Sequence, residues 1–235
     1  MNNDVVVRAF TRLGTPQVFD AALRQRVPIR IAPFGLLPVI PGKRLAGRAL
    51  PAQHFGSVDV FLEAMQAAHP GDVLVIDNGG RTDEGCIGDL TVLEARASGL
   101  TGVVVWGTHR DAGQLRQIGF PVFSYGTCLC GPQRLDPQTS DALRIAHFGP
   151  LEITRDDFVF ADDDGCIFVR HDQLDQILAS AEKIAETESR QAEKIATGKR
   201  LSDQLKFQEY LVQRQQQPGY TFRQHLRGIG GAIEE

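Results

Sequence analysis

The stretch GDVLVIDNGGRTDEGCIGDLTVLEARASGLTGVVVWGTHRD, residues 71–111, decides the fold of this chain. It holds two short runs rich in valine and isoleucine, 73–76 and 102–105, which are typical of strands buried on both faces. A segment with helical periodicity, about 89–98, separates the runs and ends at Gly99, a residue suited to a helix C-terminus. A strand, a helix and a second strand at this spacing predict parallel strands joined by a crossover helix.

The same alternation extends in both directions from this stretch. Downstream we expect a helix over 110–117, closed by Gly119, and a third strand over 121–123. Upstream, Thr15 before Pro16 predicts a helix start with Thr15 as the N-cap, and the helix should run to about Arg26. The remaining expected elements are a proline-broken loop or edge over 31–42, a strand over 44–50, a helix over 58–68, a glycine-rich loop over 78–88, helices over 172–198 and 201–216, and a weakly amphipathic tail over 220–235.

Asp162-Asp163-Asp164-Gly165 lies between two apolar runs and predicts a β-hairpin turn. A calcium loop is the alternative, but the further ligands and the terminal glutamate of such a loop are missing.

Charge and composition narrow the class of protein. The 235 residues carry 25 Lys and Arg against 29 Asp and Glu, a net charge of −4, which is unfavourable for wrapping nucleic acid. The hydrophobic fraction of 42% and the charged fraction of 23% are those of a soluble globular protein. The longest uncharged apolar stretch, 31–42, is too short and too proline-rich to span a bilayer, and no signal peptide is visible, so we expect a cytoplasmic protein.

The four cysteines contain no CxxC pair, so we expect reduced thiols. Cys128 and Cys130 form a CxC that would face one side of a strand. They could be a metal or redox pair, or two half-buried small residues. The six histidines form no HxH or HxxxH pair, which argues against a histidine-rich zinc site. His109 is the one histidine that could act near the site described next; the alternative is an exposed loop histidine.

The segment around Gly88 predicts an anion site. The helix after the glycine-rich loop begins near Gly88-Asp89, so its free N–H groups, including those of Leu90 and Thr91, point above the strand ends. The second strand delivers Arg110 and Asp111 to the same edge of the sheet, where ligands of open α/β sheets bind. The two carboxylates, Asp89 and Asp111, suggest a hard divalent cation bound through oxygen and water. The alternative is a salt bridge of Arg110 inside a solvated loop.

These residues resemble a known family. The runs GDVLVIDNGG…GDL, GVVVWGTHRD and IGFPVF are similar to those of ribonuclease E activity regulator A (RraA) and of the 4-hydroxy-4-methyl-2-oxoglutarate (4-carboxy-4-hydroxy-2-oxoadipate) aldolases. The signature is a glycine followed at a fixed distance by Arg-Asp, here Gly88 and Arg110-Asp111. The resemblance covers about residues 15–198. It implies an α/β fold, a three-layer α/β/β sandwich of the swivelling phosphohistidine-domain-like type, and a trimer or a hexamer with sites between subunits.

The resemblance also implies an activity, a divalent-metal-dependent lyase that uses Mg²⁺ or Mn²⁺ on a 2-oxo acid through a pyruvate enolate. Asp111 would be the direct metal ligand and Asp89 would hold a metal-bound water. Arg110 would contact the 2-oxo group, and the backbone N–H groups of Leu90 and Thr91 would bind the carboxylate with Gly88 at the helix start. The alternative is a non-catalytic protein-binding regulator of the ribonuclease E type.

The family aldolases also take acidic residues from a neighbouring subunit. By position these would be Asp20 in the N-terminal helix and Glu188, ten residues before Gly198. We therefore expect an RraA-like domain over 1–171 and a helical extension over 172–235 that packs on a neighbouring subunit. Thr91, Trp106 and Gln114 depart from the usual family residues, and these positions concern the choice of substrate more than the metal. As partners we expect a small 2-oxo acid and further copies of the chain, without nucleic acid or membrane.

Overall fold

The computed structural model describes residues 3–230, and within them one mixed seven-stranded sheet has the order β1-β5-β4-β3-β2-β8-β9. Strands β2 to β5 run parallel, as the sequence predicts for β3, β4 and β5, while β1, β8 and β9 pair antiparallel with their neighbours. The strands are β1 (Leu37–Pro38), β2 (Leu45–Gln53), β3 (Val73–Ile87), β4 (Gly102–His109), β5 (Val122–Ser124), β8 (Asp157–Asp162) and β9 (Gly165–Arg170), and a separate hairpin is formed by β6 (Ala146–Phe148) and β7 (Leu151–Ile153).

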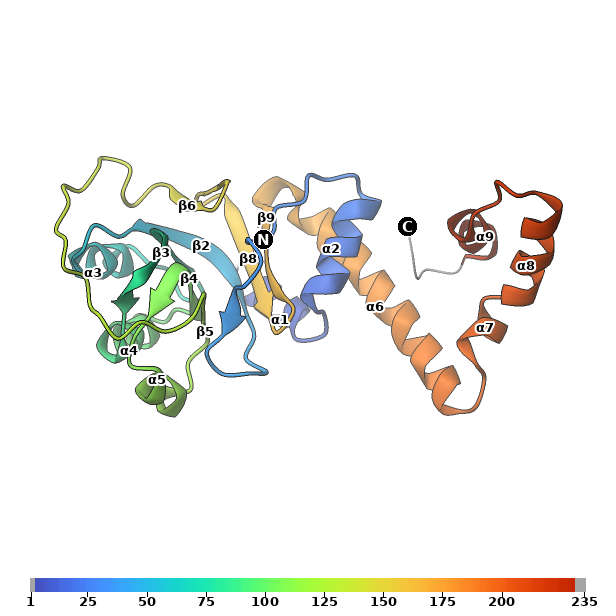
Figure 1. The fold of residues 1–235 in the computed structure, drawn as a ribbon, viewed down its shortest axis with the longest axis horizontal. Helices are drawn as coiled ribbons and strands as arrows, with labels where there is room; N and C mark the ends of the chain where they lie inside the picture. Colours follow the sequence, from blue (N-terminus) through green and yellow to red (C-terminus); the bar gives the residue numbers. More distant parts are fainter. Residues whose placement is uncertain (1–2, 231–235) are drawn as a thin grey trace.

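Helices cover the sheet in two groups, one on the parallel strands and one on the β8–β9 hairpin (Figure 1). The amphipathic patterns predicted from the sequence form these helices, with ends that differ by a few residues. The first group is α3 (Asp59–Gln66), α4 (Asp89–Ala97) and α5 (Ala112–Ile118). The second is α1 (Asn3–Phe10), α2 (Thr15–Arg24) and α6 (Leu174–Ala196), the last preceded by the short 3-10 helix η1 (His171–Gln173).

Strand β2 is shared by two β layers, which are the two halves of the curled sheet. Residues Leu45–Arg48 pair with β8, whereas Ala49–Gln53 pair with β3, so one strand belongs to both halves. Between the halves lies an apolar core that contains Val75, Val104, Phe148 and Phe168. The α/β/β arrangement that the resemblance implies is therefore present, with α1, α2 and α6 outside the β8–β9 layer.

The prediction of a glycine-rich loop over residues 78–88 is wrong, because most of this segment is part of a strand. Residues 78–87 continue β3 and pair with β4, with register shifts between Asp77 and Ile87. Gly79 and Gly80 have φ of +62° and +68°, a conformation that glycine adopts without strain, and the Trp106 ring lies against Gly80. The glycines therefore bend a strand and do not end it. The strand delivers residue 88 to the sheet edge as predicted.

Two local predictions at the hairpin and the first helix have different outcomes. Asp162 pairs with Gly165 in the β8–β9 turn, which confirms the hairpin. The N-cap of α2 is Gly14, one residue earlier than expected. The Thr15 hydroxyl bonds to Asp162 Oδ1 (2.6 Å) and is thus not available to cap the helix. This bond fastens α2 to the hairpin.

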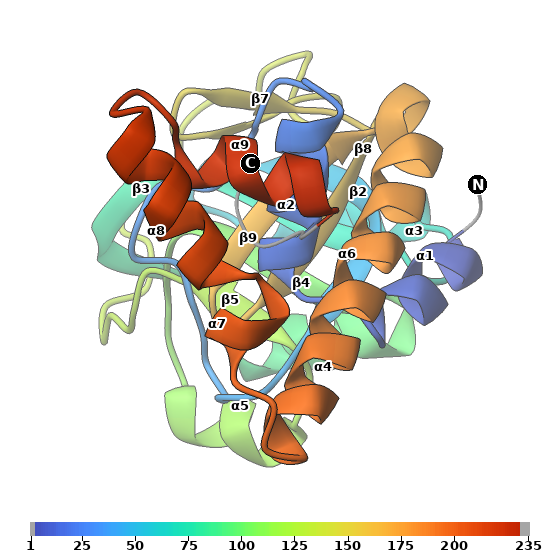
Figure 2. The same ribbon diagram turned by 90° about the vertical axis from the view of Figure 1, so that its right-hand side faces the viewer.

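Beyond α6 the described part of the chain forms three more helices, which stand away from the sheet at the far end of α6 (Figure 1) and lie in front of it in the view from that end (Figure 2). Tyr210, His225 and Leu226 are buried among them, and His225 Nε2 lies 2.9 Å from the Leu205 carbonyl oxygen. The last helix is clearly amphipathic, unlike the weak pattern expected for the tail, of which residues 231–235 lie outside the described part. These helices are α7 (Leu201–Gln204), α8 (Phe207–Gln216) and α9 (Phe222–Ile229).

No helix among residues 3–230 has both the length and the apolar character needed to cross a bilayer.

Candidate functional site

The carboxyl ends of β3 and β4 bring the two halves of the predicted site together. Ile87 pairs with His109 at the end of the ladder, and the Arg110 N–H donates to the Ile87 carbonyl oxygen (2.9 Å). The N-terminus of α4 and the residues before α5 are thereby neighbours at one edge of the sheet. Gly88, Asp89, Arg110 and Asp111 meet there, as the sequence predicts for consecutive parallel strands.

Gly88 and Asp111 fit each other closely. A Cβ atom on Gly88 would overlap Asp111 Oδ2, so the carboxylate occupies the space that any other residue would fill. The backbone of Gly88 is extended, with φ of −142°, and does not itself require glycine. Asp111 has φ of +57°, a strained conformation for a residue with a side chain. The fixed distance between Gly88 and Arg110-Asp111 therefore has a steric meaning.

Arg110 lies beside the Asp111 carboxylate, with 3.3 Å between Nε and Oδ2, and the two side chains are 48% and 27% exposed. A salt bridge of Arg110 is thus present, which was the alternative interpretation of this segment. Both side chains remain accessible, so the ion pair does not close the site to a ligand.

Some of the N–H groups in the first turn of α4 are already hydrogen-bonded and are therefore not free to bind an anion. The Leu90 N–H donates to the Asp89 carboxylate at 2.8 Å, and the Val92 N–H donates to the Gly88 carbonyl oxygen. Among the described residues the Thr91 N–H has no such partner. Of the Leu90 and Thr91 N–H groups, an incoming carboxylate would therefore find that of Thr91 free and would have to displace the Asp89 carboxylate from that of Leu90.

A loop that sequence reasoning missed closes one side of the site. The Cys128 N–H donates to the His109 carbonyl oxygen, and the Gly85 N–H donates to that of Cys130, both at 2.8 Å. A Cβ on Gly131 would lie 2.9 Å from Arg110 Nη1. The CxC pair lies in this loop and not on a strand, with Cys128 half-buried and Cys130 exposed. All four cysteines have free thiols.

His109 is buried, which overturns the exposed-loop interpretation. It ends β4, its Nδ1 lies 2.7 Å from Ser124 Oγ, and its Nε2 is buried without a hydrogen-bond partner in the described structure. Burial lowers the pKa of His109, and the nearby Arg116 lowers this pKa further. His109 is therefore held neutral behind Arg110.

Asp20 and Glu188 lie elsewhere in the chain. They belong to α2 and α6, which pack together over the β8–β9 hairpin at the far end of the sheet from α4 and α5 (Figure 1). Gln17 Nε2 donates to Glu188 Oε2 at 2.7 Å. One copy of the chain therefore does not bring Asp20 and Glu188 to its own Arg110-Asp111.

A buried polar cluster beside the site also escaped the sequence analysis. Arg134 Nη2 bonds to Glu84 Oε1 (3.0 Å), to Asn78 Oδ1 (3.1 Å) and to the His54 carbonyl oxygen (3.0 Å). His54 Nδ1 lies 2.8 Å from Asn78 Oδ1, and burial lowers the pKa of His54. Arg134 thus anchors the loop that backs Arg110. Nothing in a single loop arginine signals this role, because His54, Asn78 and Glu84 are 50 or more positions away from Arg134.

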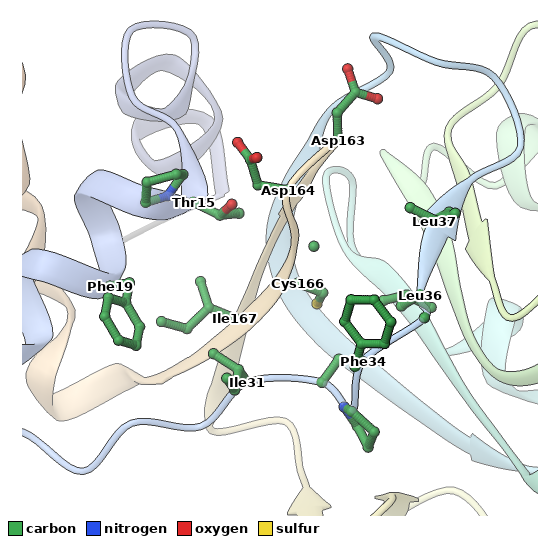
Figure 3. Close-up of a pocket in the computed structure, with 15 residues that line it drawn as sticks. Thr15, Phe19, Ile31, Phe34, Leu36, Leu37, Asp163, Asp164, Cys166 and Ile167 are labelled. Atoms are coloured by element: carbon green, nitrogen blue, oxygen red, sulfur yellow. The ribbon is translucent and has the colours of Figure 1, made fainter.

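The structure has two hollows of note away from Arg110. One, of about 580 Å³, lies between α2, β9 and the 31–37 segment, where Phe34 and Leu37 are exposed and Asp163 and Asp164 form the rim (Figure 3). The other, of about 770 Å³, lies between α3 and α4 and includes Leu90 and Thr91.

The residues at the sheet edge fit a hard divalent cation. No group of three or more His, Cys, Asp or Glu side chains suited to a metal occurs among residues 3–230. Mg²⁺ does not require one, because it is commonly held by one or two carboxylates and keeps several waters. Asp111 and Asp89 offer oxygen donors at adjacent helix starts, and the space beside Gly88 admits the Asp111 carboxylate.

Comparison with known proteins agrees with this architecture. The model of the family described as "RraA-like: Aldolase/RraA" matches residues 15–168. Protein DlpA of Legionella pneumophila is 32% identical over 129 residues, 55% of this chain and 21% of that protein. A protein of Halalkalibacterium halodurans named "Putative 4-hydroxy-4-methyl-2-oxoglutarate aldolase" is 29% identical over 144 residues, 61% of this chain and 65% of that protein. The matched stretch thus spans less than two thirds of each relative.

Among solved structures, Streptomyces coelicolor RraAS2 superposes with a TM-score of 0.67 at 28% identity, over 78% of this chain and 93% of that one. It is described as an unusual member of the RNase ES inhibitor RraA protein family.

Proposed function

The chain belongs to the RraA-like family, and on that premise we propose that it is a divalent-metal-dependent lyase acting on a 2-oxo acid. The reaction would be retro-aldol cleavage of a 4-hydroxy-2-oxo acid, decarboxylation of oxaloacetate, or both. The observation that carries this proposal is the contact between Gly88 and the Asp111 carboxylate beside Arg110, at the edge where α4 begins.

Asp111 would hold Mg²⁺ or Mn²⁺ directly and Asp89 would hold it through water. When bound, such a cation supplies Lewis-acid polarisation of the substrate's keto and carboxylate oxygens. Asp111 is suited to this role because its half-buried but accessible carboxylate is fixed in place by the strained backbone and by Gly88.

Arg110 would stabilise the negative charge that develops on the 2-oxo oxygen as the carbon–carbon bond breaks. Its Nε lies 3.3 Å from Asp111 Oδ2 and its Nη1 lies close to Gly131, so the guanidinium is already beside the proposed metal ligand. The Thr91 N–H, joined by the Leu90 N–H once Asp89 turns toward the metal-bound water, would bind the substrate carboxylate.

Asp20 and Glu188 would complete the site of a neighbouring copy in a trimer or hexamer. The support for this assignment is their position on α2 and α6, away from the chain's own sheet edge, together with the family resemblance. Ring symmetry can place such a surface of one subunit on the sheet edge of the next.

The experiment is a turnover assay on purified protein with oxaloacetate and a panel of 4-hydroxy-2-oxo acids, each with Mg²⁺ or Mn²⁺. We expect pyruvate release that EDTA abolishes and added metal restores. Protein that is inert toward every substrate with either metal would refute the proposal.

The likeness to RraAS2 supports a second candidate, a non-catalytic protein-binding regulator of the ribonuclease E type. The two functions are distinguished by combining the turnover assay with capture of purified ribonuclease E on the immobilised protein. Stoichiometric capture without lyase activity would favour the regulator.

A further inference from the structure

The part of the chain beyond α6 differs from the rest in charge. We call residues 199–229, which contain α7, α8 and α9, the C-terminal arm. The arm carries six Lys and Arg against two Asp and Glu, whereas residues 1–198 carry nineteen against twenty-five. The family match ends at residue 168, so the arm lies outside the region that the family model describes. A basic arm on an acidic body favours contact between copies.

The arm presents cations beside exposed apolar side chains. Arg223 and Arg227, one turn apart on α9, are exposed and have no ion-pair partner among the described residues. Leu201, Phe207 and Val212 are exposed by 37%, 37% and 46%. The surface of the arm therefore carries unpaired positive charge and exposed apolar side chains in addition to its own small buried core.

A surface of complementary character lies on α3 and α4. We call it the α3/α4 face: Val58, Leu62, Leu90 and Leu93 are exposed around the hollow of about 770 Å³. Leu90, 76% exposed, lies in the first turn of α4, the helix that borders the candidate site.

The charges of the α3/α4 face are mostly acidic. The two helices carry four Asp and Glu against one Arg. Three of the acidic residues, Asp59, Glu63 and Glu94, are exposed and lack an ion-pair partner within the described part of the chain. Glu94 and Arg96 line the hollow itself, and Asp59 and Glu63 lie on α3 beside it. This surplus of carboxylates next to exposed apolar side chains fits a basic, partly apolar helix.

The geometry of α6 connects the two surfaces, in an argument that rests on the proposed function. If Glu188 of one copy reaches the Arg110-Asp111 edge of a neighbour, the arm begins eleven residues farther along, about 16 Å at the rise of an α-helix. Helix α4 starts at that edge and is itself about 13 Å long. The start of the arm would then lie within reach of the same neighbour's α4.

We propose that the C-terminal arm of one copy docks on the α3/α4 face of a second copy and covers Leu90 and Thr91. Those two residues supply the N–H groups of the proposed carboxylate site, so the site is open to water until the arm is in place. The arm excludes water from the reacting carbons and strengthens the electrostatic interactions within.

Charge reversal in the full chain tests the docking. Arg223→Glu with Arg227→Glu reverses the arm, and Glu63→Arg with Glu94→Arg reverses the face. All four residues are exposed, so folding is preserved, which circular dichroism checks. The matched control is Arg8→Glu with Arg12→Glu, an exposed pair at the same spacing in and just after α1. Sedimentation equilibrium measures association between copies, a readout independent of turnover.

We expect the arm reversal and the face reversal each to weaken association at least tenfold, the control to leave it unchanged, and the variant with both reversals to recover it. Unchanged association in both reversals overturns the docking, even where lyase activity is present. If the variants show the expected changes in association but the protein has no lyase activity, the proposed function is refuted and the docking proposal stands.

Zero-length carbodiimide cross-linking of mixed ¹⁴N and ¹⁵N protein identifies the occupant. Docking between copies predicts mixed-isotope cross-links from Lys199 or Lys206 to Asp59, Glu63 or Glu94. Cross-links confined to one isotope show an arm folded on its own body and overturn the proposal. So does co-purified nucleic acid that protects the arm lysines from reaction.

Discussion

Substitution of Gly88 by alanine tests the candidate site at its most constrained point. The extended backbone at Gly88 suits alanine, so the main penalty is the overlap of the new methyl group with Asp111 Oδ2. To restore a normal contact the carboxylate must move by roughly 1 Å, and a displacement of that size at a reacting centre typically costs about 10²-fold in rate. We therefore expect kcat/KM for oxaloacetate to fall about 100-fold and Mn²⁺ binding to weaken.

Gly113→Ala is the matched control for this substitution. Gly113 lies in α5, two residues after Asp111, and a Cβ there meets no atom within 4 Å. Alanine at this exposed helical position should leave kcat/KM unchanged and stabilise the protein by about 0.5–1 kcal/mol. Steady-state assays and Mn²⁺ calorimetry on both variants give the comparison. Wild-type turnover and metal affinity in Gly88→Ala would refute the steric interpretation of the glycine.

Four further outcomes follow from the same geometry. Asp111→Ala should abolish metal binding in calorimetry, and wild-type affinity would contradict its role as the ligand. Arg110→Ala and Glu188→Ala, each inactive alone, should regain turnover when subunits are mixed; near-normal activity of the glutamate variant alone would exclude a shared site. Arg134→Met leaves a buried carboxylate without its main partner, and urea denaturation should show a loss of about 3 kcal/mol. Because burial lowers the pKa of His54 in the folded state, only the unfolded state takes up its proton just below pH 6.5. The free energy of unfolding should therefore fall as pH drops below about 6.5, and His54→Gln should flatten this dependence; an equally steep fall in the variant would assign it to other groups.

The sequence alone determined the order of strands and helices because each pattern is local. The apolar runs 73–76 and 102–105 and the glycines at 99 and 119 marked parallel strands and helix ends that the structure confirms. The position of Gly88 and Arg110-Asp111 at one edge followed from that topology, since consecutive parallel strands end on the same side.

Only the tertiary structure decided what depends on residues distant in the chain. A glycine pair such as Gly79-Gly80 is compatible with a loop and with a bent strand. The pairing of β3 with β4 makes this segment a strand. His109 is buried because β4 runs farther than its apolar run indicates. Arg134 acquires its role from partners on β3 and just after β2 that no local pattern connects to it. Periodicity in the sequence shows which face of a helix or strand is buried. The surface that this face packs against depends on contacts between segments far apart in the sequence.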